Sequence, residues 1–440
     1  MKHLAMLSLL TIFAFWLKSV RIQSGWQHSG LMTFSLGFVL LAAYAGAHIL
    51  KFAKLPLISG YILAGIVAGP YVAGFLSHYM VEQLRLVDDL ALSFIALTAG
   101  GTLHLQFMKK RRRAIALNIT LLTTVVFTLV FMSVKLIGDS FGTDLNLSSS
   151  QVMALACLLG VIAVARSPSS AVAIISECRA SGVFTSTVLG VTVTMDVLII
   201  TLFTLALTAT KIILFSGGAV DYAVFAALFA EIIGSLLLGA ILGKGITFYI
   251  DKAGHDLALF LLFFAFGVTK ASLWLNLYME ANYSVYLHVK PLLICMSAGF
   301  TIRNFGSAGH AFLEGLDRVS LPIYVLFFSL AGASLDLDAL RVTWPIALSL
   351  AGVRAAGIFI ATWFAGKLNG DPEVHNRVAW MAYLTQAGVA IGLAQLAQQQ
   401  FPEIGTFLTT VVLAVITVNQ VVGPVTFKAA LKAVGEIKGG

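Results

Sequence analysis

The stretch "GVIAVARSPSSAVAII" (160–175) places Arg166, Pro168 and three serines inside a long apolar run. A proline removes a backbone donor and its ring clashes with the preceding turn, so a helix breaks at this point. In lipid, a broken helix exposes N–H and C=O groups, which is tolerated only against protein or a water-filled cavity. The stretch therefore predicts an interrupted membrane helix that faces a polar site inside the protein.

The rest of the chain has the composition of a membrane protein, since 59% of its 440 residues are hydrophobic and only 11% are charged. A helix needs about 20 apolar residues to cross a bilayer. We predict an all-α polytopic protein in the lipid bilayer of the cell inner membrane. Its thirteen expected spans are 31–50, 56–77, 88–107, 114–136, 152–176, 184–212, 219–243, 257–277, 287–303, 319–335, 344–366, 377–398 and 404–428.

The basic residues orient these spans. Placing "KKRRR" (109–113) in the cytoplasm puts most Lys and Arg, and the C-terminus, on the cytoplasmic side, as the positive-inside rule requires. The net charge of +8 then needs no nucleic-acid partner. Residues 1–30 resemble a signal sequence without a clear cleavage site, so we expect a retained apolar helix there.

The spans divide into two halves with opposite orientations. Residues 31–212 and 257–430 each hold six helices, 213–256 hold a linking helix and a cytoplasmic loop, and 431–440 form a short cytoplasmic tail. An offset of seven helices inverts the second half, as in many secondary transporters. The fifth helix of that half contains "LTQAGVAIG" (384–392), so its expected break at Gly388 matches the first break at Pro168. Two facing breaks predict an ion site near the middle of the bilayer.

An ionisable residue lies one helix after the first break. Asp196, in "GVTVTMDVLII" (190–200), is costly inside a membrane and therefore points to a function. One carboxylate that holds either a proton or a monovalent cation is the simplest antiport site. Asp196 is therefore the expected ligand of the monovalent cation. Arg354 and Arg166 are the expected charge-compensating residues. The expected ion-binding set is Asp196, Ser167, Ser169, Thr194, Thr385 and Gln386.

Other polar residues have simpler interpretations. Glu231 and Lys270, on adjacent helices, are interpreted as a structural ion pair. Asp88 and Asp89 suit a helix N-terminus, or they attract cations to an outer funnel. We expect no cofactor besides the transported ions and no enzymatic activity, because the chain has no P-loop, GxSxG or HExxH motif.

Five stretches along the chain belong together: "LPLISGYILAGIVAGP" (55–70), "VDDLALSFIALTAGGTLHLQFMKKRRR" (87–113), "LLICMSAGFTIRN" (292–304), "LPIYVLFFSLAGASLDL" (321–337) and "VVGPVTFKAALK" (421–432). In this order they resemble the monovalent cation:proton antiporter superfamily, nearest its bacterial sodium/proton and potassium-efflux branch. The resemblance implies a homodimer in which a core domain moves against a dimerisation domain, with the ion site where helices 5 and 12 cross. Asp196 matches the family's ion-carrying aspartate and Arg354 its basic residue. Ser167, Pro168 and Ser169 match the first crossing segment, and Thr385, Gln386 and Gly388 match the second.

The chain departs from the family pattern at two positions. Met195 stands where the family usually has Asp, Asn or Gln, and Arg166 stands where it has a small or hydroxyl residue. A single carboxylate favours one proton per cation. The leading hypothesis is therefore electroneutral sodium/proton exchange at Asp196. The alternatives are potassium/proton exchange, proton-coupled anion transport through Arg166, and a non-transporting sensor with a permanent Arg166–Asp196 pair.

Overall fold

The computed structural model describes residues 29–50, 56–141, 147–215, 222–252, 254, 256–283 and 289–437. The expected N-terminal helix falls almost wholly outside these ranges. All regular elements in the described ranges are helices, as predicted. They are α2 (Ser29–Leu50), α3 (Leu57–Ala68), α4 (His78–Gln83), α5 (Arg85–Thr102), α6 (Leu105–Lys110), α7 (Arg112–Phe141), α8 (Ser149–Val164), α9 (Pro168–Glu177), α10 (Val183–Phe215), α11 (Tyr222–Lys252), α12 (Leu257–Tyr283), α13 (Pro291–Phe305), α14 (Gly309–Ala333), α15 (Leu337–Asn369), α16 (Glu373–Val378), the 3-10 helix η2 (Ala379–Ala382), α17 (Gly388–Gln400) and α18 (Pro402–Ala433).

Every predicted span contains one or more of these helices. Within the described residues, eight helices are long and apolar enough to cross a membrane. The other five predicted spans coincide with helices that do not meet that criterion, so the number thirteen stays a prediction. The proposed domain boundaries likewise stay predictions.

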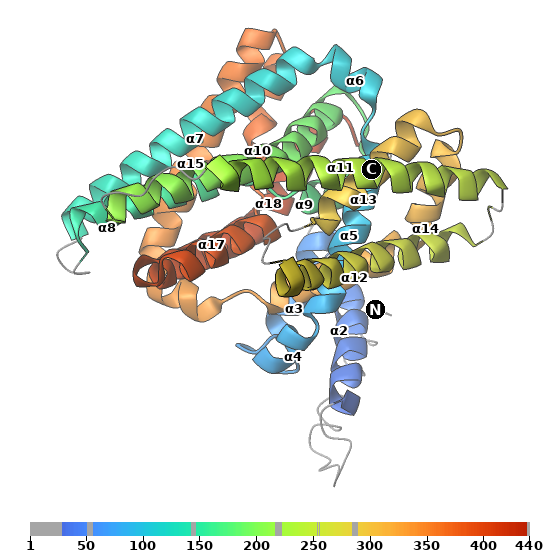
Figure 1. The fold of residues 1–440 in the computed structure, drawn as a ribbon, viewed down its shortest axis with the longest axis horizontal. Coiled ribbons are helices and arrows are strands. Elements are labelled where there is room, and N and C mark those ends of the chain that lie inside the picture. The colour runs from blue at the N-terminus through green and yellow to red at the C-terminus, as the bar shows by residue number, and fades with distance from the viewer. Residues whose placement is uncertain are drawn as a thin grey trace.

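The helices form two bundles. In Figure 1, α12 to α14 lie on the right of the molecule and α7, α8, α15 and α17 on the left. We call α2, α3, α5, α12, α13 and α14 the scaffold bundle, because they pack on one another. We call α7 to α10 and α15 to α18 the crossing bundle. The linking helix α11 runs across the front of both and packs on α13.

The scaffold bundle is built from two equivalent helix crossings. At the first, Gly100 of α5 meets Gly299 of α13, and at the second, Gly65 of α3 meets Gly332 of α14. At each of the four glycines an added Cβ would overlap a backbone carbonyl of the opposing helix. Small residues at a crossing let two helices approach to backbone contact, which is how membrane helices pack tightly.

Polar contacts close the same end of each crossing. Asn304 donates to the Leu103 carbonyl (2.8 Å) and accepts from the Leu105 N–H (2.8 Å), beyond the first pair of glycines. Beyond the second pair, the Tyr71 hydroxyl donates to Asp336 Oδ1 (3.1 Å).

The two crossings reveal the inverted repeat, since α5 and α14 are third helices of their halves and α3 and α13 are second helices. The sequence carries a trace of it: "ALTAGGTL" (96–103) aligns with "FSLAGASL" (328–335), and the glycines that cross occupy the same position in both. The sequence analysis predicted the repeat from the order of the helices but did not find this alignment, because only a few residues coincide.

One predicted ion pair is wrong. Glu231 of α11 pairs with Lys290 at the start of α13 (Oε2–Nζ 3.5 Å) and not with Lys270. The ammonium of Lys270 lies 6.0 Å from the ring centre of Phe266. The cause is tertiary: α11 packs closely on α13, which brings the N-terminus of α13 to Glu231.

The glycine crossing predicts a sharp difference between two Gly→Ala substitutions. Gly299→Ala should lower the free energy of unfolding by about 1–3 kcal/mol, because its methyl group overlaps the Leu97 carbonyl. Gly352→Ala on α15 is the control: no atom lies within 4 Å of its added Cβ, so it should be neutral or slightly stabilising. Thermal unfolding of the detergent-purified variants measures both. Equal melting temperatures would contradict the crossing.

Candidate functional site: two interrupted helices at the floor of a cavity

The two predicted helix breaks meet. Helix α8 ends at Val164, and α9 begins at Pro168 after three non-helical residues. In the second half, Tyr383 to Ala387 are non-helical between η2 and α17. The Ser167 N–H donates to the Thr385 carbonyl (3.2 Å), so the two unwound segments are hydrogen-bonded to each other. Four half-helices therefore end at one point, with C-terminal ends from α8 and η2 and N-terminal ends from α9 and α17.

Serines and Pro168 start α9 at this point. Ser167 is the N-cap, and its Oγ accepts from the Ser170 N–H (3.2 Å). The same Oγ donates to Ser170 Oγ (2.9 Å) and lies 3.0 Å from Ser169 Oγ. Pro168 occupies the first helical position, where its missing N–H costs nothing. The serines thus replace backbone partners that the break removes.

Arg354 of α15 holds the C-terminal ends together. Its Nε donates to the Ala163 carbonyl (2.8 Å), its Nη2 to Ala165 (3.0 Å) and Tyr383 (3.5 Å), and its Nη1 to Leu384 (2.9 Å). Only 1% of the residue is exposed. A positive charge at the C-terminal ends of helices complements their partial negative charge. The structure thus gives Arg354 a compensating contact with backbone from both halves.

Gln386 also serves the crossing. Its Nε2 donates to the Ile162 carbonyl (2.9 Å), and its Oε1 accepts from Asn419 Nδ2 of α18 (3.1 Å). Both polar atoms of the Gln386 side chain therefore have a hydrogen-bond partner in the protein. The sequence analysis did not single out Asn419, although a side-chain amide in the middle of an apolar span indicates a buried polar contact.

A cavity of about 620 Å³ lies next to the crossing of the two interrupted helices. Asp196, Arg166 and the first residues of α9 and α17 line it, together with acidic residues from α4, α5 and the start of α15. Those acidic residues are Glu82, Asp88, Asp89 and Asp336. Asp88 lies in the first turn of α5, which is the first of the two roles expected for this pair, and both Asp88 and Asp89 line the cavity, where the second role, the attraction of cations, stays a prediction.

Asp196 of α10 lies against this cavity without a protein partner. It makes no hydrogen bond or ion pair with any residue in the described part of the chain. Its neighbour Met195 is buried. The structure does not bring Thr194 to the site: that side chain is exposed and its hydroxyl donates to the Gly190 carbonyl (2.7 Å).

Arg166 does not pair with Asp196 either. Its guanidinium nitrogens have no hydrogen-bond partner among the described residues, and only 2% of the residue is exposed. Its charge lies 5.6 Å from the ring centre of Tyr383. A permanent Arg166–Asp196 pair, one of the alternatives considered above, is therefore not formed.

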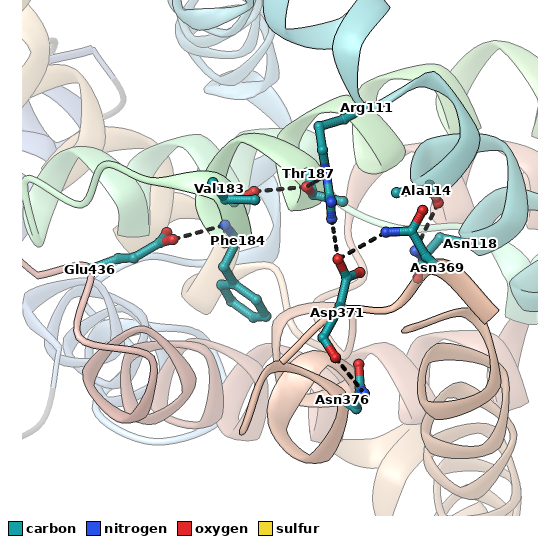
Figure 2. A network of polar contacts seen from close by, with 10 residues as sticks. All are labelled: Arg111, Ala114, Asn118, Val183, Phe184, Thr187, Asn369, Asp371, Asn376 and Glu436. Carbon is teal, nitrogen blue, oxygen red and sulfur yellow. Dashed lines mark hydrogen bonds and ion pairs between the residues drawn. The ribbon is translucent and has the colours of Figure 1, made fainter. Parts of the chain in front are cut away.

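The opposite end of the crossing bundle is closed by a polar network (Figure 2). Arg111, where α6 meets α7, donates to Asp371 Oδ1 (2.6 Å), in the loop between α15 and α16. Asn369 donates to the same oxygen (2.8 Å), and Asn376 donates to the Asp371 carbonyl (3.1 Å). Between this network and Tyr383 lies a space of only about 30 Å³.

A second contact closes the seam between the bundles at the end of α9. The Glu177 carboxylate accepts from the N–H groups of Leu57 (2.8 Å) and Ile58 (3.2 Å) at the start of α3. It therefore joins the crossing bundle to the scaffold bundle, and Lys428 lies 3.5 Å from the same carboxylate.

Comparisons with known proteins agree with this architecture. The profile of the transmembrane sodium/hydrogen exchanger family matches residues 37–433. The chain therefore belongs to the sodium/hydrogen exchanger family, within the monovalent cation:proton antiporter superfamily. No curated protein shows a significant sequence match.

Solved structures share the fold. The sodium proton antiporter MjNhaP1 from Methanocaldococcus jannaschii at pH 8 is 18% identical, with a TM-score of 0.58, over 92% of this chain and 96% of that one. An electron-microscopy structure of MjNhaP1 is 17% identical, with a TM-score of 0.71, over 94% of this chain and all of that one. At these identities the likeness concerns the fold.

The two buried arginines should respond differently to removal. Arg354→Met leaves carbonyls at both breaks unsatisfied and should destabilise the protein by about 3 kcal/mol or more. Arg166→Met removes a buried charge that has no hydrogen bonds, so stability should stay equal or rise. Thermal unfolding of both variants in detergent is the measurement. An equally large loss in Arg166→Met would show that Arg166 is held by contacts absent from this account.

Proposed function

We propose that the protein exchanges a monovalent cation for protons across the membrane, with Asp196 binding the two in turn. The supporting observation is the position of Asp196: an unpaired carboxylate in a cavity that reaches the crossing of two interrupted helices. An intramembrane acid without a protein partner is stable only if it holds a proton or a cation. Competition for one carboxylate couples the two ions without further machinery.

Electroneutral exchange follows from the same residue. Met195 offers a thioether, which is a poor ligand for sodium and for protons. Asp196 alone then carries one proton in one direction and one monovalent cation in the other. Sodium is the favoured cation, in agreement with the family name, and potassium is the second candidate. The hydroxyls of Ser167 and Ser169, which line the same cavity, can contribute further oxygen ligands.

Alternating access requires movement of the crossing bundle against the scaffold bundle. The cavity wall consists of scaffold residues on one side and crossing residues on the other, so such a movement would close it. On the opposite side, the Glu177 contact with Leu57 and Ile58 would have to break. We propose a homodimer in the cell inner membrane, with the C-terminus in the cytoplasm. The exposed apolar side chains of α12, such as Phe263 and Trp274, suit lipid or a second copy.

Asp196→Asn should abolish exchange. In proteoliposomes that carry an internal pH dye, sodium or potassium added to wild type should drive proton movement with or without a membrane potential. Asp196→Asn should give none, because an amide binds neither ion in exchange for the other. Asp338→Asn, an exposed acid on the first turn of α15, is the matched control and should exchange normally. Exchange at the wild-type rate in Asp196→Asn would refute the carrier role.

A further inference from the structure

The partial charges of the C-terminal and N-terminal helix ends at the crossing are not compensated equally. The C-terminal ends of α8 and η2 receive the Arg354 guanidinium, which satisfies their carbonyls. The N-terminal ends of α9 and α17, which carry partial positive charge, point to the cavity floor. There the chain adds Arg166, another positive charge, so a compensating negative group is needed.

The carboxylates that line the cavity do not supply this balance. Asp196 offers one negative charge, and it makes no ion pair with Arg166. The remaining acids come from the outer ends of helices. Along α5, the lining runs from Asp88 to Ala99, a depth of about 16 Å at 1.5 Å per residue. With two helix ends of about half a charge each, Arg166 and ionised Asp196, the floor keeps about one net positive charge.

Arg166 itself shows that an acceptor is missing. All three guanidinium nitrogens are buried without a hydrogen-bond partner. Buried donors without acceptors are costly, and Arg354, on the other side of the crossing, has a carbonyl acceptor for each of its three guanidinium nitrogens. The aromatic ring of Tyr383 lies on one side of Arg166, and the residue lines the cavity on another, from which an acceptor can approach.

We propose that a small monovalent anion, of the halide or nitrate class, binds at the cavity floor between Arg166 and the N-terminal ends of α9 and α17. Helix N-termini attract anions through the helix dipole and through N–H groups; at α9, where Pro168 has no N–H and Ser167 caps the Ser170 N–H, the dipole is the main contribution. A guanidinium adds charge-assisted donors. The Ser169 hydroxyl, which also lines the cavity, is a further donor. One negative charge matches the net charge of the floor.

The anion would assist the cation. While the floor is positive, a cation at Asp196 is repelled by Arg166 and by both helix ends. An anion beside Arg166 removes this repulsion, so the two ions should bind with positive cooperativity. This second effect rests on the proposed cation/proton exchange at Asp196, whereas anion binding does not.

Thermal unfolding tests anion binding directly. At fixed ionic strength and pH, replacing gluconate by chloride, bromide or nitrate should raise the melting temperature of purified wild type by several degrees, in a saturable manner. Arg166→Gln should lose the shift, Arg166→Lys should keep part of it, and Arg341→Gln should keep all of it, because Arg341 is exposed on α15. An unchanged wild-type melting temperature, or a full shift in Arg166→Gln, would overturn the proposal. If Arg166→Gln does not fold, Arg166→Lys with its single ammonium must show the weakened shift.

Transport separates the two proposals. In proteoliposomes, the half-saturating sodium concentration of wild type should be about tenfold lower in chloride than in gluconate, and equal in the two media for Arg166→Gln. If the half-saturating sodium concentration of wild type is equal in chloride and gluconate, the cooperativity is overturned and the proposed function stays intact. A halide-dependent melting temperature without any cation/proton exchange would refute the proposed function and leave the anion site.

Discussion

The hydrogen bonds from Arg354 to the carbonyls of both broken helices are the interaction on which the site depends. An unwound helix in a membrane needs partners for its backbone, and one guanidinium supplies them for Ala163, Ala165, Tyr383 and Leu384. Since these carbonyls come from both halves of the repeat, one side chain fixes how the halves cross. The helix N-termini are thereby left free to face the cavity and Asp196.

The helix crossings of the scaffold bundle are built differently from those of the crossing bundle. There the crossings are filled by glycines, Gly100 on Gly299 and Gly65 on Gly332, so the helix backbones come into contact. The helices that cross in the scaffold bundle are thus continuous, whereas those that cross in the other bundle are interrupted. The cavity lies where the two meet, and the Glu177 contact closes the same seam at the other end.

Sequence reasoning predicted the parts of the site that follow from local chemistry. Pro168 had to break a helix, Asp196 and Arg354 had to have a reason for lying inside a membrane, and all three gather at the crossing or its cavity. Thr194 was assigned to the site and lies away from it, because positions two apart on a helix face different directions. The partners of Glu231 and Gln386 could not be predicted, since they depend on which helices pack together.

Proton release on cation binding tests the central claim most directly. Purified protein in weakly buffered detergent solution is titrated with sodium, potassium and lithium salts of one anion, while a pH dye reports protons. If Asp196 holds either ion but never both, wild type should release about one proton for each cation bound at a pH where the cation-free carboxylate is fully protonated, and Asp196→Asn should release none. The same release from Asp196→Asn, or cation binding to wild type with no proton release at any pH, would contradict the account.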